Sequence, residues 1–241
     1  MFRSAGDTTL IVEFGDIIDR HILEQVAALE QTVAQLHVEG QLPGLIETVP
    51  TFRSLAIIVD PLTTSPSIVR KCIENAPSTG KAHTPDTRHW SLPVSYGGND
   101  GPDIESLSES IGLEPAEIIT RHHQVTYSVY MLGFLPGYAF MGDIDHSLRQ
   151  PRRRQPRTRV PEGSVAIANQ LTAVYPWESP GGWHLLGYCP VPLFDNTASV
   201  PALLAPGDKV SFRPVTAAEA QDLAADLAAG KQQSSNYLLP S

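Results

Sequence analysis

The sequence predicts an α+β protein with two domains, a small one over residues 1–86 and a strand-rich one over residues 87–241. In the first part, short runs of β-branched and apolar residues alternate with two helical patterns. The chain holds 21 Pro and 18 Gly, and they are dense over residues 127–195, where they argue against ordinary helix because Pro lacks a backbone donor and Gly loses conformational entropy. Residues 76–86 are rich in Pro, Ser and Gly, which is typical of a linker.

The first domain is expected to follow a ferredoxin-like plan, a split βαβ arrangement with the order β-α-β-β-α-β. An apolar period of about 3.6 residues follows Asp19, the expected N-cap, and ends before Gly40, which predicts a helix. A second helix is expected to start at Ser65 or Ser67 and to run toward Asn75. The strands are expected at Thr8–Phe14, Leu45–Val49, Ser54–Asp60 and, completing the sheet, at about Arg88–Val94.

The second domain is expected to open with two short helices and to continue as a compact β-barrel or sandwich. Gly112 marks the end of the first helix, and Pro115 suits the first turn of the second. An Ala-rich tail capped by Thr216 predicts a terminal helix. The elements are expected at Ile104–Ile111, from Pro115 to His122 or His123, in short strands from Val125 to Arg213, and in a helix over Thr216–Gly230.

Arginine is concentrated in one short segment of the second domain. Six of the 17 basic residues lie within eleven positions of a chain whose net charge is −9. Because the chain is acidic overall, this cluster indicates a local anion site rather than a nucleic-acid surface. A carboxylate, phosphate or carboxyphosphate group suits it. The six residues are Arg149, Arg152, Arg153, Arg154, Arg157 and Arg159.

The composition gives no indication of a disulfide framework or a metal site. Two cysteines are too few for such a framework, and the eight histidines are scattered except for His122-His123. There is no Walker-type loop to indicate nucleotide binding. Neither a signal peptide nor a membrane-spanning stretch is visible. We therefore expect a cytoplasmic protein that binds a small molecule and neither nucleic acid nor membrane.

Short motifs spread over nearly the whole chain resemble one known family in their order. Each motif alone is weak, but together they are specific. They include Tyr96-Gly97-Gly98 with Gly101-Pro102-Asp103, Leu132-Gly133-Phe134 with Pro136-Gly137, Ser179-Pro180-Gly181-Gly182-Trp183, and Pro206-Gly207-Asp208. The sequence in this way resembles the family of 5-oxoprolinase B subunits, also called allophanate hydrolase subunit 1 or the KipI-type kinase A inhibitors, which is related to the carboxyltransferase subdomains of urea amidolyase.

The resemblance implies an N-terminal α/β domain and a C-terminal cyclophilin-like β-barrel. It also implies one part of an enzyme that works with a companion, the C-type or allophanate hydrolase subunit 2 homologue, and in the 5-oxoprolinase system with a third, LamB-type subunit. Together these use ATP to open the lactam of 5-oxoproline to glutamate, so ATP enters through the resemblance alone. Two alternatives stay open: the carboxyltransferase part of a biotin-dependent urea carboxylase-like system, and a non-enzymatic inhibitor of a histidine kinase.

The chain departs from the family's pattern in two places. Where the family usually has Ala-Gly-any-Gln-Thr-Gly-Ile-Tyr-Pro, residues 168–176 carry Leu171 at the Gln position. The usual Gly-Arg-Thr-Pro is Gly187-Tyr188-Cys189-Pro190. If the missing Gln or Arg contacts ligand, the substrate differs or catalysis has been lost.

His122 and Asp103 are the candidate catalytic residues. An imidazole titrates near neutral pH and suits acid/base chemistry, and Asp103 is a candidate to orient it. The alternative interpretation is that His122 only ends a helix, where a cation suits the helix dipole.

Substrate binding is expected at Arg157 and Arg159, because a guanidinium grips a carboxylate or phosphoryl group in a bidentate manner and residues two apart in a strand share a face. The alternative is a solvated strand edge that discourages aggregation. The remaining candidates are expected to shape ligand-facing loops or line a pocket, with turn formation and core packing as their alternatives. They are Gly133, Phe134, Pro136, Gly137, Tyr175, Gly181 and Gly182.

Overall fold

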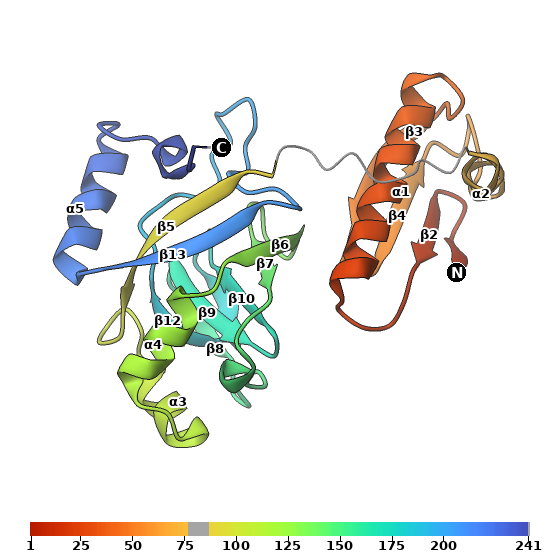
Figure 1. The fold of residues 1–241 in the computed structure, drawn as a ribbon. Helices are drawn as coiled ribbons and strands as arrows, with labels where there is room; N and C mark the ends of the chain where they lie inside the picture. The colour runs from red at the N-terminus through yellow and green to blue at the C-terminus, as the bar shows by residue number, and fades with distance from the viewer. Residues whose placement is uncertain (77–86, 241) are drawn as a thin grey trace. The chain divides into compact units, whose positions relative to one another are not determined.

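The computed structural model describes residues 1–76 and 87–240 and confirms the expected α+β class (Figure 1). The chain divides into two compact units, Met1–Pro85 and Asp86–Ser241. Of the expected linker, only Ala76 lies within the described residues. No helix in the described part of the chain is long and apolar enough to cross a membrane.

In the described residues, the first unit is a four-stranded antiparallel sheet with two helices. Its strand order is β1-β2-β4-β3, and β2 and β3 are both antiparallel to β4, so α1 joins two parallel strands that have a third between them. This is the split βαβ arrangement. The elements are β1 (Phe2–Ala5), β2 (Thr9–Glu13), α1 (Arg20–Val38), β3 (Leu45–Pro50), β4 (Ser54–Val59) and α2 (Pro66–Asn75).

Strand alternation builds the core of this unit. Every second residue of β4 is fully buried, and β2 buries Leu10 and Val12 in the same way, so one face of the sheet carries the apolar side chains. The helix α1 covers these side chains with Val26, Val33 and Leu36. Its N-cap is Asp19, as predicted, and the Asp19 carboxylate accepts hydrogen bonds from the backbone N–H groups of the first turn.

The prediction of the last strand of the first domain was wrong. The segment expected at Arg88–Val94 is β5 (His89–Tyr96), but β5 pairs inside the barrel of the second unit. The edge position beside β2 is taken by β1, which forms a hairpin with β2 through Gly6 at φ +68°. Three of the four residues of β1 are exposed, so the apolar pattern that predicts strands is absent from it.

The second unit is a closed barrel in the order β10-β7-β6-β13-β5-β12-β9, with a separate pair of strands, β11 and β8. In Figure 1, β5 and β13 run side by side, and they pair in parallel along their whole length. The other barrel pairs are antiparallel. The strands are β6 (Tyr127–Leu132), β7 (Ala139–Gly142), β8 (Arg157–Val160), β9 (Ser164–Ala168), β10 (Leu171–Val174), β11 (Ser179–Gly181), β12 (His184–Tyr188) and β13 (Lys209–Val215).

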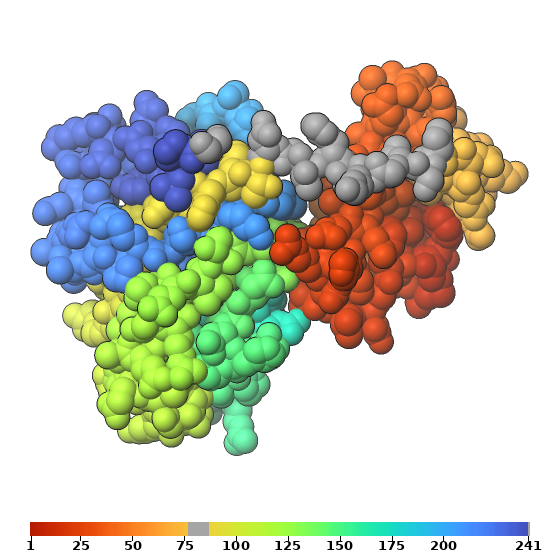
Figure 2. Space-filling view, viewed as in Figure 1, coloured from red at the N-terminus to blue at the C-terminus, as the bar shows by residue number. Residues whose placement is uncertain are grey.

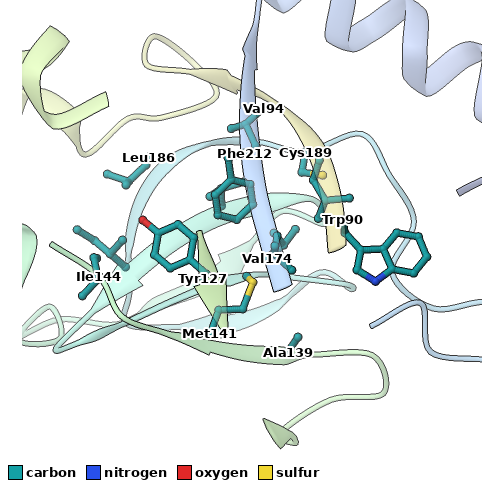
Figure 3. Close-up of a cluster of buried hydrophobic side chains, with 14 of the residues drawn as sticks. Trp90, Val94, Tyr127, Ala139, Met141, Ile144, Val174, Leu186, Cys189 and Phe212 are labelled. Carbon is teal, nitrogen blue, oxygen red and sulfur yellow. The ribbon is translucent and has the colours of Figure 1, made fainter. Parts of the chain in front are cut away.

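Apolar side chains from many strands fill the barrel. Tyr127, Met141, Val174 and Phe212 converge in its interior, as Figure 3 shows, and each is almost completely buried. These residues come from four different strands, so the barrel is a packed core rather than a channel.

The described part of the second unit has three α-helices: α3 (Ile104–Ile111), α4 (Pro115–His123) and α5 (Ala217–Ala228). Gly112 ends α3 in a left-handed conformation, and the Thr216 hydroxyl caps α5 by accepting from the N–H of Glu219, both as predicted. The yellow-green surface in Figure 2 belongs largely to α3 and α4. The loop before α3 and the strand β8 build the candidate site.

Candidate active site

Asp103 is the centre of a buried charge network. Its side chain is only 4 % exposed. The Arg157 guanidinium donates in a bidentate manner, from Nη1 to Oδ2 at 2.9 Å and from Nη2 to Oδ1 at 2.7 Å. Arg153 Nη1 donates to Oδ1 at 2.6 Å, and the backbone N–H of Leu185 donates to Oδ2 at 2.7 Å. One carboxylate thus fixes two arginines that lie 50 and 54 positions further along the chain.

The protonation state of Asp103 follows from these partners. Burial raises the pKa of Asp103, but the hydrogen bonds from Arg157 and from the Leu185 N–H, together with the charges of Arg157 and Arg153, outweigh burial. The pKa of the carboxyl therefore lies below its ordinary value of 3.8. Asp103 is an anion at neutral pH, and its role is to hold the arginines.

A close-packed loop presents Asp103 to these partners. Gly97 donates its N–H to the Leu186 carbonyl, and the backbone N–H of Asp103 donates to the Leu185 carbonyl, so the loop between β5 and α3 lies directly on β12. A Cβ atom on Gly101 would collide with the Leu186 carbonyl. Only glycine permits this approach. Although Asp103 stands at the N-cap position of α3, its side chain makes no cap hydrogen bond because the arginines use it.

A pocket of about 270 Å³ opens beside this network. It contains both arginines that the sequence proposed as a clamp, Arg157 and Arg159. They differ in setting, because Arg157 is held by Asp103 whereas the Arg159 side chain is 76 % exposed and pairs through Nε with Glu178 at 2.6 Å. The lining residues are Asn99, Asp100, Pro102, Arg157, Arg159, Pro161, Ser164, Leu185 and Tyr188.

The structure places His122 in the barrel core and away from Asp103. His122 is completely buried, and its ring stacks on Phe212 with 5.0 Å between the ring centroids. The Thr172 hydroxyl donates to the Ala166 carbonyl, so it accepts from His122 Nε2 at 2.9 Å, and Nδ1 then accepts from the Tyr96 hydroxyl at 2.8 Å. The Asp103 carboxylate accepts hydrogen bonds from Arg153, Arg157 and the Leu185 N–H and does not orient His122.

Burial also fixes the charge of His122. Burial, together with a smaller contribution from the charge of His123, lowers the pKa of His122 to about 3. The imidazole is therefore neutral at physiological pH, with both nitrogens occupied. The hypothesis of a catalytic His122–Asp103 pair is corrected by this geometry, because neither ring nitrogen reaches the pocket or the carboxylate. Of the two interpretations of His122, the structural one fits: it lies in the last turn of α4 and packs inward.

The predicted glycine-rich loop does not face the pocket. Gly133 donates its N–H to the Tyr138 carbonyl at 3.1 Å, and Tyr138 donates to the Leu135 carbonyl at 3.0 Å, so the backbone donors close the turn upon itself. Gly137 has φ +77°, and the Pro136 carbonyl accepts from the indole N–H of Trp177 at 3.0 Å. Gly133, Phe134, Pro136 and Gly137 are separate from the described residues that line the pocket.

Tyr175, Gly181 and Gly182 are not among the described residues that line the pocket. A Cβ atom on Gly181 would collide with the Tyr175 hydroxyl, so glycine lets this buried tyrosine reach the backbone of β11. Burial raises the pKa of Tyr175, against the lowering influence of Tyr138, Arg152 and Arg157. The Gly182 carbonyl accepts from the Arg153 N–H at 2.8 Å. Gly182 thus contacts the arginine segment through the backbone of Arg153.

Four polar pocket residues and one network residue were not assigned to the site from the sequence. Arg153 was named only as one of the six clustered arginines, and Tyr188 only as a departure from a motif. Asn99 and Asp100 follow Gly97-Gly98 and precede Gly101-Pro102, and this turn-forming cluster before Asp103 is the signal that marks a functional loop. Ser164, at the start of β9, carries no comparable signal.

The described residues contain no group of three or more His, Cys, Asp or Glu arranged to hold a metal ion. The chemistry of the site is that of an anion pocket: one fixed guanidinium, one exposed guanidinium, a carboxylate, an amide and two hydroxyl groups. Such a set can bind a small carboxylate and orient it through directional hydrogen bonds.

Comparison with known proteins finds one family over most of the chain. The model of the family described as carboxyltransferase domain, subdomain C and D, matches residues 1–204. The 5-oxoprolinase B subunit of Bacillus subtilis (strain 168) is 37 % identical over 218 residues, which cover 86 % of this chain and 89 % of that protein. The urea amidolyase of Lachancea kluyveri is 25 % identical over 265 residues, which cover 95 % of this chain and 14 % of that protein.

A solved structure agrees with these matches. The crystal structure of TTHA0988 superposes with a TM-score of 0.75 at 32 % identity and covers 89 % of this chain. The match covers 40 % of the solved chain, so the present chain spans about two fifths of that protein.

Proposed function

The chain belongs to the carboxyltransferase domain, subdomain C and D, family and within it to the group of 5-oxoprolinase B subunits, and from this premise we propose that it is the B subunit of a 5-oxoprolinase-type hydrolase complex. The complex would open the lactam ring of 5-oxoproline to give glutamate at the expense of ATP. The observation that carries the proposal is Arg157, which Asp103 fixes in the wall of a pocket of about 270 Å³.

In this proposal the pocket holds the carboxylate of 5-oxoproline. Arg157 uses one hydrogen of each Nη atom for Asp103, and the remaining N–H groups of its five are free for a ligand. Because Asp103 fixes the guanidinium before the ligand arrives, little rotamer freedom is lost on binding. Arg159 uses Nε for Glu178 and retains its Nη groups, so it can close over the ligand from the exposed rim.

The pocket lacks the features of a nucleotide site. Its lining includes the carboxylate of Asp100, and the sequence has no Walker-type loop. We therefore assign the nucleotide to another chain of the complex.

A surface beside the loop between β6 and β7 is our candidate for the companion subunit. Phe134 is 64 % exposed at φ +70°, a backbone conformation that a bulky residue rarely adopts, and Trp177 is 41 % exposed with its indole N–H held by the Pro136 carbonyl. Two rigid aromatics presented to solvent are typical anchors of a protein interface. The subunit names of the relatives supply the kind of partner, a second chain of the same hydrolase.

The test of the function is 5-oxoproline-dependent ATP hydrolysis, measured on this chain alone and after mixing with its candidate companion subunits. We expect turnover only in the mixture, and about a 100-fold loss when Arg157 is replaced by Ala, because the fixed guanidinium orients the substrate. Full turnover with Arg157→Ala would contradict the assignment of the site. A Phe134→Ser variant that assembles as tightly as the wild type would contradict the companion surface.

A second candidate is favoured by the match to urea amidolyase and by the description of the family. In that case the chain would take part in biotin-dependent carboxyl transfer to a nitrogen, and the same pocket would hold a carboxylated intermediate through Arg157. The two candidates are separated by substrate. Urea-dependent carboxylation by an assembled complex that is silent toward 5-oxoproline would favour the carboxyltransferase.

A further inference from the structure

Asp100 places a negative charge in the same pocket as the two arginines. Its Oδ2 atom accepts a hydrogen bond at 2.6 Å from Ser95 Oγ, whose residue lies buried in β5. In the described residues, the two pocket arginines form ion pairs with other carboxylates, Arg157 with Asp103 and Arg159 with Glu178. Asp100 takes part in neither pair. The Asp100 carboxylate is therefore held in position by a neutral group, and no ion pair among the described residues compensates it.

The arginines, in contrast, are largely compensated. Arg153 and Arg157 share Asp103, and Arg159 has Glu178. A single carboxylate bound at Arg157 replaces water on a guanidinium that retains free donors. A phosphate or polyphosphate brings two or more negative charges into a small pocket that already contains the Asp100 carboxylate. Like charges that are close together in a partly buried site repel each other strongly.

The wall around Asp100 strengthens this effect. Tyr188 lines the pocket, and burial raises the pKa of its hydroxyl, with Cys189, Glu162 and Asp100 adding to the rise, so Tyr188 stays neutral and contributes no charge of its own. Leu185, Pro102 and Pro161 make much of the remaining lining apolar. A hydrogen-bond donor of the ligand facing Asp100 would gain a charge-assisted hydrogen bond in this setting.

We propose that Asp100 makes this pocket selective for a small monocarboxylate that carries an N–H donor, and excludes phosphate and polyphosphate. The carboxylate lies at Arg157, and the N–H of the ligand donates to Asp100. That 5-oxoproline is this ligand rests on the proposed function; the exclusion of polyphosphate rests on the pocket alone.

The experiment is calorimetric binding to the full chain, and to the assembled complex if the chain alone binds weakly. The probes are 5-oxoproline, its lactone analogue with ring oxygen in place of N–H, and inorganic pyrophosphate. Wild-type protein is expected to prefer 5-oxoproline over the lactone by about tenfold, the effect of one charge-assisted hydrogen bond. Pyrophosphate is expected to bind at least about tenfold more weakly than 5-oxoproline.

Asp100→Asn is the decisive variant, because its amide oxygen can still accept from Ser95 while the charge is removed. We expect it to lose the preference for 5-oxoproline over the lactone and to bind pyrophosphate about tenfold more tightly than the wild type. Asp222→Asn removes the same charge at an exposed position of α5 and is expected to leave all three affinities unchanged. Asp100→Glu keeps the charge and should continue to exclude pyrophosphate.

Two results would overturn the proposal: pyrophosphate binding that is equal in Asp100→Asn and wild type, or tight pyrophosphate binding by the wild type. If Asp100→Asn fails to fold, tight pyrophosphate binding by Asp100→Glu has the same force. A different result would be that Asp100 excludes pyrophosphate but the protein does not bind 5-oxoproline. This would contradict the proposed function and leave the proposed selection by charge intact. Absence of binding by all probes, in the chain and in the complex, would refute both.

Discussion

The barrel unit contains two polar networks that both join residues distant in sequence, one of them charged and the other neutral. The Asp103 network joins a carboxylate to arginines at the edge of a pocket, and the His122 network joins an imidazole to two hydroxyl groups inside the core. Each connects side chains that lie at least 26 positions apart in the sequence. The first keeps its charges and the second has none. Access to the pocket, rather than residue type, therefore decides which titratable groups can take part in chemistry.

The physical reason lies in the cost of burying a charge. Asp103 is buried but receives four hydrogen bonds, three of them from cations, so its ionised form is favoured. His122 has only neutral partners, and protonation would place an unpaired cation in the core. The comparison teaches that a histidine near a helix end is a poor acid/base candidate once both of its nitrogens are satisfied by buried neutral groups.

Removal of the central carboxylate should produce the largest change. In Asp103→Ala, two partly buried guanidinium groups lose their partner, and we expect the free energy of unfolding to fall by about 3 kcal/mol, the usual cost of breaking a buried ion pair from one side. Activity of the assembled complex should fall by about 100-fold because Arg157 is no longer fixed. Urea unfolding and turnover measure the two effects. Glu178→Ala is the matched control for the stability measurement, since its ion pair is exposed.

Replacement of the guanidinium by an ammonium tests geometry separately from charge. Arg157→Lys keeps a cation near Asp103 but loses the bidentate fork. We expect turnover of the complex to fall by about 30-fold and KM for 5-oxoproline to rise, with a smaller loss of stability than in Asp103→Ala. Equal KM values for Arg157→Lys and wild type would mean that the carboxylate does not bind here.

The neutral network makes its own prediction about pH. Because the pKa of His122 is about 3 in the folded protein and about 6.5 when unfolded, the unfolded state binds more protons between these values, and stability must fall as pH decreases below about 6.5. Between pH 7 and pH 5 the loss attributable to His122 should be about 2 kcal/mol. Asp103, whose pKa is below 3.8, contributes its loss only at lower pH.

Chemical unfolding of wild type and His122→Gln at several pH values isolates this contribution. The glutamine variant should be less stable at pH 7, but its free energy of unfolding should change less between pH 7 and pH 5. Its turnover, corrected for the folded fraction, should stay within about twofold of the wild type, because His122 lies outside the pocket. Parallel pH dependences of the two proteins would show that His122 is not held neutral.

The sequence predicted those features that depend on neighbouring residues. Asp19, Gly112 and Thr216 end or begin helices through local hydrogen bonds or a left-handed backbone, so the helix boundaries were correct within one or two residues. The same logic failed for β5, because its parallel partner β13 lies about 120 residues later and no local signal specifies that pairing. The wrong assignment to the first domain followed from that long separation.

The candidate site shows the same division. Asp103 and Arg157 were both identified from the sequence, but in different roles, and their ion pair across 54 positions was not foreseen. The outward or inward direction of His122 is set by the packing of α4 on the barrel, which residue type cannot reveal. The pocket wall formed by Asp100 and Tyr188 likewise requires the loop before α3 and the end of β12 to meet in space.

The smallest effect is expected at Arg159, the exposed arginine of the pocket. It tests whether an arginine without a buried carboxylate partner contributes less than Arg157. Arg159 lines the same pocket as Arg157, yet its side chain is 76 % exposed and its partner Glu178 is half exposed. An exposed ion pair contributes little, so Arg159→Ala should change the free energy of unfolding by at most about 0.5 kcal/mol. Affinity for 5-oxoproline should fall by about fivefold, measured by calorimetry against Arg152→Ala as a control for the loss of one surface charge. Arg159→Ala could instead abolish turnover as completely as Arg157→Ala. Fixation by a buried carboxylate would then not be what makes an arginine essential in this pocket, because Arg159 has no such partner among the described residues.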